Sequence, residues 1–355
     1  MRLDTVGGMP RPVSARATNL AVLAALIVVF ATGVSAVATG SPRGRWVVIA
    51  HGVGAFALVF LIPWKTIVVR RGWRRRRATR WASLALVVLV IGAISAGLSS
   101  ATGLVIEVAG FEMLWWHIAL ALGLVPVLLF HLVTRPVRLR RPRRTAARVT
   151  EIDRRSALRL GAVALAAAAT WTATEATLRL TGAAGSRRRF TGSHEIGTDD
   201  PAAMPATIWL NDTVPHLDAD RFTLTIVDES GHREIRLADL TGEEQTVRAV
   251  LDCTSGWYAE QEWTGIPVGS LLTPDPGARS LFVHSVTGYW VRFPVADIDT
   301  LLLARRVGGQ RLREGHGYPV RLVAPGRRGF WWVKWVDRIE LHRTPWWWQP
   351  PFPVT

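Results

Sequence analysis

The stretch LDCTSGWYAEQEWTGIPVGSLL, residues 251–272, holds the only cysteine of the chain, Cys253. A single thiol cannot form an intramolecular disulfide, and it lacks the further cysteines of a Cys-based zinc site. Two interpretations stay open on these residues alone. A lone cysteine is most often a small buried hydrophobe, whereas its thiolate is also a soft ligand for a transition metal. The surrounding glycine, serine and tryptophan residues are typical of a shaped turn rather than a core strand.

A second stretch, HGYPVRLVAPGRRGFWWVKWVDRIEL (316–341), concentrates His316, Arg321 and Lys334 with three glycines around two strand-like runs. Glycines let backbone N–H groups approach an anion, and Arg and Lys add charge-assisted hydrogen bonds. The stretch therefore suits a phosphate-bearing cofactor, although it contains neither a P-loop nor a G-x-G-x-x-G motif. A surface hairpin with solvated basic residues is the alternative.

These residues belong to a C-terminal half whose apolar runs have the length of strands. Alternating apolar and polar residues occur in 221–228, 280–286 and 318–325, and glycine and proline separate the runs. The pattern predicts a compact α+β domain over 190–355. The short segment before it, 179–189, is predicted to be a tether.

The N-terminal half, residues 1–178, is predicted to be an all-α transmembrane domain of about five helices. A helix needs about 20 apolar residues to cross the hydrocarbon core of a membrane. Four runs reach that length and a fifth, Ala-rich run is marginal: 20–39, 47–69, 82–101, 113–133 and 158–174. The first run is too long for the apolar core of a cleaved signal peptide, so it is interpreted as a retained helix.

The charge pattern predicts an orientation. The formal net charge is +16, almost all from arginine, since lysine occurs only at Lys65 and Lys334. Arginine clusters at 70–77 and 135–155 flank apolar runs, which is the positive-inside signal of a membrane protein and argues against nucleic acid as a partner. The loop 102–112 has two acids and no base, so it is predicted to face outward. Five crossings then make the chain a multi-pass membrane protein with an extracytoplasmic C-terminal half.

The fifth apolar run follows the paired residues Arg154 and Arg155. This arrangement resembles a twin-arginine export signal placed inside the chain, which would address a translocase that moves folded proteins. An ordinary basic flank of a membrane helix explains the same residues. Both interpretations stay open.

Three histidines fall within the predicted spans: His51, His117 and His131. An ionisable group at membrane depth is a functional hypothesis by default. His51 and His117 are predicted to lie at similar depth near the outer face, where two neutral imidazoles are suited to axial ligation of haem b. His131 lies 14 residues after His117, but the residue 14 after His51 is Lys65, so a second haem layer is broken or absent. Interfacial histidines bonded to water or loop carbonyls are the alternative.

Two patterns in these stretches together resemble the molybdopterin-binding domain of the sulfite oxidase family over about 190–345. They are C-x-x-G-W…W-x-G-x-P…L-L and H-G-x-P-x-R…P-G-x-x-G…V-K-W. That family includes sulfite oxidases, plant-type nitrate reductases and the catalytic subunit of the periplasmic methionine-sulfoxide reductase, and this chain most resembles the reductase branch. The resemblance implies a molybdenum–molybdopterin cofactor with Cys253 as the metal-ligating thiolate. It also implies contacts from this chain to the pterin and its phosphate through Thr191, His194, Glu195, Thr287, His316, Arg321, Trp332, Val333 and Lys334. Tyr289 matches the spacing of an active-site tyrosine.

The resemblance implies two-electron oxygen-atom transfer with a small oxo-donor or oxo-acceptor such as sulfite or a sulfoxide, and a quinone or cytochrome as electron partner. A reductase of methionine sulfoxide or another S- or N-oxide is the alternative. A non-catalytic membrane sensor with a degenerate cofactor fold is an alternative of a different class, against which the retained Cys253 argues. The Trp- and Pro-rich tail, 344–355, either docks on membrane lipid or packs on its own domain.

Overall fold

The computed structural model describes residues 15–73, 80–105, 107–134, 154–208 and 212–350. The chain divides into two compact units, one of Met1–Ala36 with Arg45–Ser186 and one of Val37–Gly44 with Arg187–Thr355. We refer to them as the helical unit and the β unit. The boundaries predicted from the sequence, 1–178, 179–189 and 190–355, stay predictions.

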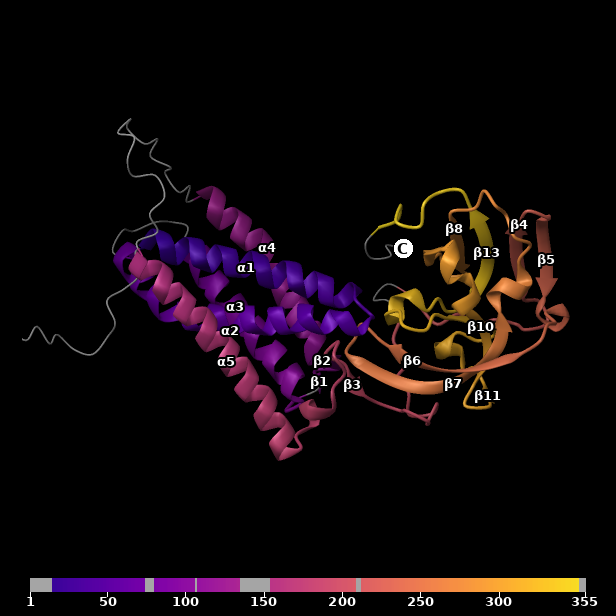
Figure 1. The fold of residues 1–355 in the computed structure, drawn as a ribbon, viewed down its shortest axis with the longest axis horizontal. Helices are drawn as coiled ribbons and strands as arrows, with labels where there is room; N and C mark the ends of the chain where they lie inside the picture. The colour runs from indigo at the N-terminus through magenta and orange to yellow at the C-terminus, as the bar shows by residue number, and fades with distance from the viewer. Residues whose placement is uncertain (1–14, 74–79, 106, 135–153, 209–211, 351–355) are drawn as a thin grey trace, which may run out of the picture. The chain divides into compact units, whose positions relative to one another are not determined.

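The described residues of the helical unit contain five helices, labelled in Figure 1. By length and composition, all five are long and apolar enough to cross a membrane, in agreement with the five predicted runs. The fifth helix is longer than its apolar run suggested. The helices are α1 (Ala15–Ala38), α2 (Arg45–Trp73), α3 (Arg80–Thr102), α4 (Met113–Thr134) and α5 (Arg154–Thr181), and a short hairpin, β1 (Glu107–Val108) with β2 (Phe111–Glu112), precedes α4.

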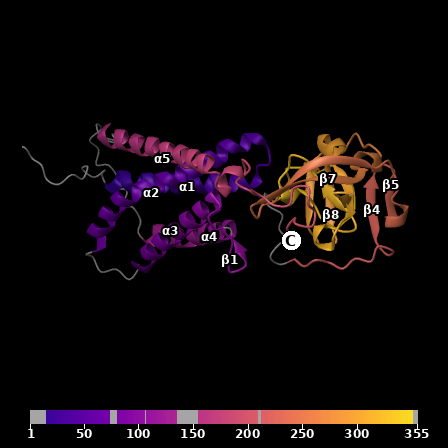
Figure 2. The ribbon, with the colours of Figure 1, turned by 90° about the horizontal axis from the view of Figure 1, so that it is seen from below.

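Within this unit α3 packs along α4 and α2 packs along α5 (Figure 2). Glycines occupy several of the contacts. A Cβ atom added at Gly52 of α2 would lie 2.0 Å from the ring of Trp171 on α5, so only glycine fits there. Small residues that allow close backbone approach are typical of helix packing in membranes. The segment 135–153 and residues 74–79 lie outside the described residues, so the orientation predicted from their arginines stays a prediction.

The β unit consists of two sheets. The first contains β11–β10–β7–β3 in that order, with β12 also paired to β10 and β6 to β7; the second has the order β5–β4–β13–β8–β9. Its strands are β3 (His194–Glu195), β4 (Thr223–Asp228), β5 (Gly231–Arg236), β6 (Gln245–Asp252), β7 (Trp257–Pro267), β8 (Ser280–Ser285), β9 (Trp290–Pro294), β10 (Leu302–Val307), β11 (Gln310–Arg311), β12 (Arg321–Val323) and β13 (Val336–His342).

The α+β class predicted for this unit differs from the structure. Over 187–208 and 212–350 the regular elements are strands and 3₁₀ helices of three to six residues, and these described residues contain no α-helix. The reason is local: segments such as Val268–Leu271 and Val295–Thr300 follow a proline and are followed at once by an extended residue. They are too short to continue beyond a 3₁₀ turn.

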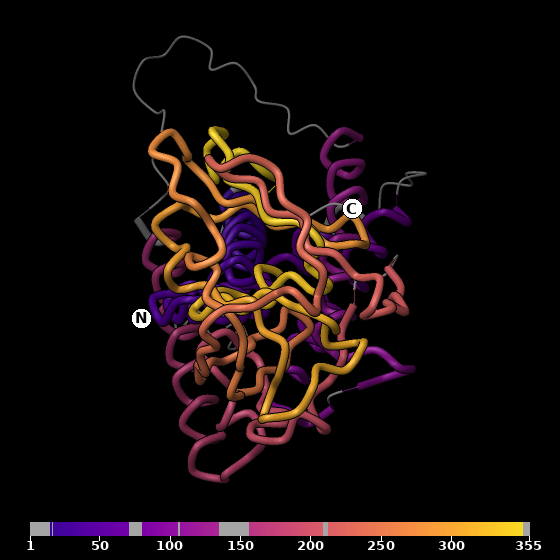
Figure 3. Tube along the Cα trace, turned by 90° about the vertical axis from the view of Figure 1, so that its right-hand side faces the viewer, coloured from indigo at the N-terminus to yellow at the C-terminus, as the bar shows by residue number. Residues whose placement is uncertain are grey.

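The central strand β7 positions the site. Its eleven residues alternate between buried and less buried side chains, with Trp257, Ala259 and Trp263 in the core, as a half-buried strand requires. β7 pairs with β6 across the turn that contains Cys253. In Figure 3 the yellow C-terminal segment runs among the orange strands, and β13 accordingly pairs with β4 and β8. Residues far apart in the sequence therefore share one core.

The described part of the Trp-rich tail packs on the β unit. The side-chain amide of Gln349 accepts from the Arg292 N–H (2.9 Å) and donates to the Arg292 carbonyl (3.0 Å) beside β9. Trp347 and Trp348 are more than half exposed. The tail thus contacts its own domain and also presents apolar surface outward.

Candidate cofactor site

Cys253 lies in the tight turn between β6 and β7. The Cys253 N–H donates to the Trp257 carbonyl (2.8 Å), and the Gly256 N–H donates back to the Cys253 carbonyl (3.3 Å). Gly256 has φ +109°, a conformation that disfavours other residues, which explains the glycine three positions after the cysteine. The half-buried Sγ accepts a hydrogen bond from the Ser255 hydroxyl at 3.2 Å. The turn therefore holds the thiol in one orientation.

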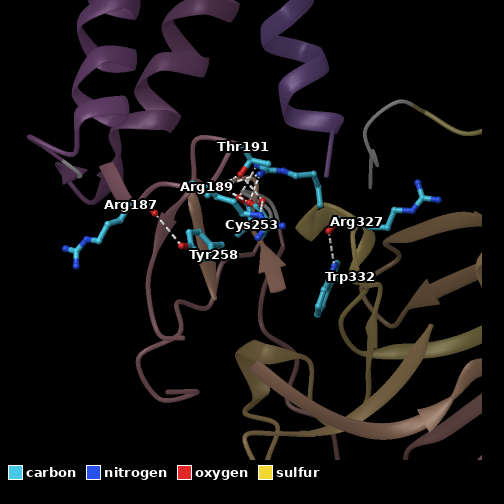
Figure 4. Close-up of polar contacts among 10 residues, drawn as sticks. Arg187, Arg189, Thr191, Cys253, Tyr258, Arg327 and Trp332 are labelled. Atoms are coloured by element: carbon cyan, nitrogen blue, oxygen red, sulfur yellow. Dashed lines mark hydrogen bonds and ion pairs between the residues drawn. The ribbon is translucent and has the colours of Figure 1, made fainter. Parts of the chain in front are cut away.

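The second chemical stretch folds against this turn. A Cβ atom at Gly329 would lie 3.0 Å from the Cys253 Cα, so the P-G-R-R-G loop reaches the cysteine only because glycine stands there. Arg328 forms a parallel bridge with Asp252 and donates to the Cys253 carbonyl from Nη2 (3.2 Å). Figure 4 shows Arg327 and Trp332 of this loop on one side of Cys253. The two stretches singled out in the sequence thus meet at one place.

Arg321 is a fully buried cation of this site. Its guanidinium donates to the carbonyls of His316 (3.1 Å) and Trp332 (3.3 Å) and lies over the Trp263 ring, 5.0 Å from the centroid. Burial lowers the pKa of Arg321 to about 9, and the negative charge of Cys253 works in the opposite direction. Its Nε is buried and has no hydrogen-bond partner among the described residues. Such an orphaned donor is costly unless a ligand accepts from it.

Lys334 is the second buried cation. Its Nζ donates to the carbonyls of Thr207 (2.8 Å) and Gly315 (2.6 Å). Burial, followed by the charge of Arg321, lowers the pKa of Lys334 to about 7, against the opposing influence of Cys253 and Asp212. An ammonium that protein carbonyls only partly stabilise is ready to bind an anion.

The turn at His316 brings these groups together. His316 is buried, and its Nε2 lies 3.0 Å from an Nη of Arg313. Burial, with further contributions from Arg321, Lys334 and Arg313, lowers the pKa of His316 to about 3, so the imidazole is neutral at physiological pH. Gly317, at φ +101°, closes the turn because a Cβ atom there would meet the side chains of Arg321 (2.9 Å) and Lys334 (3.1 Å).

The residues present fit an anionic cofactor with a thiolate-liganded metal. The charge of a soft sulfur donor acts on two buried cations, one of which has an unused donor nitrogen among the described residues. The pKa of Arg321 and that of Lys334 are both lowered by burial and both raised by the charge of Cys253. Excess buried positive charge of this kind is unfavourable without a counter-anion, and a phosphate-bearing pterin supplies one.

The segment at 190–195 also reaches this turn. His194 and Glu195 form β3, which pairs with Trp257 and Tyr258 of β7, and the His194 N–H donates to the Gly256 carbonyl (2.7 Å). The Glu195 carboxylate accepts from the Thr198 N–H. Thr191 donates to Asp252 (2.8 Å), so its hydroxyl is held by the protein.

Four other predicted residues lie around the same loops. Thr287 lies in the β8–β9 turn, within 3.2 Å of the Ser285 hydroxyl, and the adjacent Val286 N–H donates to the Trp335 carbonyl. The Tyr289 hydroxyl donates to the Phe330 carbonyl. The side chains of Trp332 and Val333 are buried in the core. The Trp332 carbonyl accepts from Arg321 and its indole N–H donates to the Arg327 carbonyl (3.2 Å), while the Val333 carbonyl accepts from the Leu322 N–H.

Sequence reasoning missed a buried polar cluster beside the thiol. Asp252 precedes Cys253 directly and contacts Arg189, Thr191, Ser193 and Arg328. Asp252, Ser193 and Arg328 are each 2% exposed or less. The available signal was a carboxylate directly after the apolar run Ala249–Leu251 at the end of β6, but its partners lie 59 or more residues away.

His51 and His117 lie in the helical unit, on α2 and α4. Their ring centroids are 5.7 Å apart with an interplanar angle of 86°. The two histidines that the sequence paired by depth thus lie close together, and their role as haem ligands stays a prediction.

Comparison with known proteins identifies the family of the β unit. Residues 211–347 match the family described as oxidoreductase molybdopterin binding domain. A nitrate reductase [NADPH] of Beauveria bassiana is 26% identical over 161 residues, which cover 41% of this chain and 17% of that protein. The protein-methionine-sulfoxide reductase catalytic subunit MsrP of Gluconobacter oxydans is 30% identical over 130 residues, 30% of this chain and 41% of the relative.

The chain spans about half or less of the curated relatives that it matches. Among solved structures, the sulfane dehydrogenase SoxCD from Paracoccus pantotrophus aligns with a TM-score of 0.36 and 26% identity, over 37% of this chain and 40% of that one. The sequence motifs around Cys253 and Lys334 and the family match agree with each other. Residues 211–347 therefore match an oxidoreductase molybdopterin-binding domain, in agreement with the resemblance of this part of the chain to the sulfite oxidase family.

Proposed function

We propose that this chain is a membrane-bound molybdenum-cofactor oxidoreductase that catalyses two-electron oxygen-atom transfer at the extracytoplasmic face. The observation that supports it most is the single thiol, Cys253, oriented beside the buried cations Arg321 and Lys334. When bound, a molybdenum–pterin centre supplies the oxygen-atom transfer chemistry, and the protein binds and tunes it.

Each residue has a proposed role in this assignment. Cys253 ligates the metal, Arg321 and Lys334 bind the phosphate, and neutral His316 contributes a hydrogen bond. Tyr289, whose hydroxyl is held by the Phe330 carbonyl, is proposed to orient the substrate. The pterin is proposed to lie against the remaining contacts, Thr191, His194, Glu195, Thr287, Trp332 and Val333.

The test is metal content combined with a substrate screen on the full chain in detergent. About one molybdenum per chain and turnover with an artificial electron carrier are expected. Sulfite oxidation supports the main proposal. Reduction of methionine sulfoxide or another S- or N-oxide supports the second candidate, which the 30% identity to the methionine-sulfoxide reductase subunit favours. Bound cofactor without turnover of any of these substrates would favour the sensor alternative.

The proposed location rests on the five apolar helices and on the arginine pattern. The side of the membrane on which the β unit lies can be tested by labelling one introduced cysteine, because Cys253 is the only cysteine of the chain and can be replaced. We expect that Ser230→Cys, at an exposed position of the β4–β5 hairpin, combined with Cys253→Ser, reacts with a membrane-impermeant maleimide on intact cells. Labelling only after lysis would place the β unit in the cytoplasm.

We also propose that the helical unit holds one haem b as the electron relay towards a quinone or cytochrome partner. In this unit Nδ1 of His51 lies 2.8 Å from the Val29 carbonyl, and Nδ1 of His117 lies 2.7 Å from the Ala93 carbonyl. Metal-ligating histidines commonly donate one ring N–H to a carbonyl in this way, which fixes the ring and leaves the other nitrogen to the metal.

The spacing of the two rings supports the same proposal. Imidazoles that share one metal through nitrogens at about 2 Å place their ring centroids roughly 6 Å apart, close to the 5.7 Å between His51 and His117. Glycines clear the space beside the rings: a Cβ atom at Gly97 would lie 2.7 Å from Nδ1 of His117, and one at Gly33 would lie 3.1 Å from the His51 ring. The inner position carries Lys65, which donates to Asn19 (2.9 Å), so one haem is proposed.

Replacing His51 or His117 with alanine is expected to remove the α-band from the dithionite-reduced spectrum. Gly97→Ala is expected to reduce haem occupancy because its methyl group displaces the His117 ring. Gly123→Ala on α4 is the matched control, since a Cβ atom there makes only an ordinary 3.8 Å contact with Leu89. Wild-type protein without an α-band, or His51→Ala protein that retains it, would contradict the haem proposal.

A further inference from the structure

A single buried carboxylate joins the segments around the thiol. Asp252 Oδ1 accepts from the Ser193 hydroxyl (2.7 Å) and from Nη1 of Arg328 (2.5 Å). Its Oδ2 accepts from the Thr191 hydroxyl (2.8 Å) and forms an ion pair with Nε of Arg189 (3.0 Å) that lacks the alignment of a hydrogen bond. Asp252 is 2% exposed, so the carboxylate itself is shielded from water, while the Arg189 side chain is 26% exposed.

These contacts fix the position of Cys253. Asp252 is bonded to it through the backbone, and Arg328 donates to Asp252 and to the Cys253 carbonyl at the same time. The carboxylate therefore ties the end of β6 to the 189–193 segment and to the 326–329 loop. Buried networks in which the members are bonded in this way hold their groups rigidly.

The charges of the cluster do not balance. Two guanidinium groups, Arg189 and Arg328, face one carboxylate, and the buried cations Arg321 and Lys334 are close enough to feel the charge of Cys253. In a poorly solvated site each unit charge acts strongly on its neighbours. Removing the carboxylate would leave the positive charges of both arginines near Cys253 without the negative charge that offsets them.

We infer that Asp252 is a positioning residue that holds Cys253 in its metal-ligating orientation and sets the reduction potential of the metal centre by offsetting the charges of Arg189 and Arg328. This inference rests on the proposed molybdenum site. It assigns to Asp252 no contact with substrate or cofactor. Its effect reaches the metal through the backbone of Cys253 and through the local field.

The test compares Asp252→Asn with the wild-type full chain by potentiometric titration followed through the Mo(V) electron paramagnetic resonance signal. The substitution keeps the shape of the side chain and removes its charge, so the midpoint potential is expected to rise, since extra positive charge favours the reduced centre. A changed Mo(V) spectrum is also expected, because the Cys253 turn loses one of its fixed partners.

Asp228→Asn is the matched control. Asp228 is likewise a buried carboxylate, paired with Arg233 at 2.6 Å, but it lies at the end of β4 and has no contact with the Cys253 turn in the described residues. It is expected to cost comparable stability and to leave the potential and the spectrum unchanged. Equal shifts in both variants would overturn the inference, because they would show a general loss of stability.

Arg189→Gln keeps the inference testable if Asp252→Asn does not fold or load molybdenum. The Arg189 side chain is 26% exposed, so its loss should be tolerated, and removal of one positive charge is expected to lower the potential. The double variant should return towards the wild-type potential, whereas independent structural damage would add. Wild-type potentials in both single variants would overturn the inference. A wild-type chain without molybdenum would instead overturn the proposed function.

Discussion

Cys253→Ala is expected to abolish molybdenum-dependent turnover while the protein remains folded. Changes to groups that merely support a metal ligand cost about ten- to a hundredfold in affinity or activity, and loss of the ligand itself should cost more than about a hundredfold. The thiol is half-buried at a turn, so its truncation should cost about 1 kcal/mol of stability or less. Molybdenum per chain, turnover and thermal unfolding measure these effects.

Two further variants separate metal ligation from packing. Cys253→Ser keeps the size of the side chain but offers no soft thiolate, so it should behave like Cys253→Ala. Ser255→Ala removes only the hydrogen bond to Sγ and is expected to retain molybdenum. If Cys253→Ala retained the metal and the activity, the cysteine would be the small hydrophobe of the first interpretation.

The second large effect is a dependence on pH caused by Lys334. Its pKa is about 7 in the folded protein against 10.5 ordinarily, so between these values the unfolded chain binds more protons than the folded one. The stability of the cofactor-free protein should therefore rise with pH across that window, by on the order of a few kcal/mol. Pulse proteolysis of the full chain in detergent, with cleavage followed in the β unit, measures it.

Two other buried titratable groups of the site, His316 and Arg321, change the stability of the protein mainly outside the range from pH 7 to 9. The pKa of His316 is about 3 in the folded protein and 6.5 ordinarily, so this group adds stability only as pH rises between these two values. The pKa of Arg321 is about 9 in the folded protein, so this group contributes only above pH 9. Between pH 7 and 9 the slope is therefore assigned to Lys334. Lys334→Met should remove this slope of stability against pH. It should also weaken cofactor binding about ten- to a hundredfold, which corresponds to the loss of one charge-assisted hydrogen bond. A slope that survives in Lys334→Met would refute the assignment.

Binding of the anionic cofactor should reverse the effect of burial on Lys334. A nearby phosphate stabilises the ammonium form and raises its pKa. The cofactor is therefore expected to stabilise the protein more at pH 7 than at pH 9, and this difference should disappear in Lys334→Met. The difference in unfolding midpoint between loaded and cofactor-free protein at the two values provides the measurement.

Features that depend on nearby residues could be predicted from the sequence. The five apolar helices follow from runs of about 20 residues, because in a membrane the backbone must satisfy its own hydrogen bonds. The strands at 221–228 and 280–286 follow from alternation, and β4 and β8 lie there. The α+β class predicted for the β unit differs from the structure because segments of three to six residues are too short for their sequence pattern to distinguish a 3₁₀ turn from an α-helix.

The sequence by itself determined which chemical groups this protein has available: one thiol in a Gly/Trp turn, a glycine-rich stretch with His316, Arg321 and Lys334, and two histidines at matching positions of two apolar runs. Tertiary structure alone decided how these groups are tuned. The low pKa of Lys334 and the orphaned donor of Arg321 arise from burial by strands distant in sequence. Asp252 gained its role only when segments 59 to 76 residues away folded onto it. Burial and long-range pairing depend on strand register across the whole domain, and no local pattern encodes them.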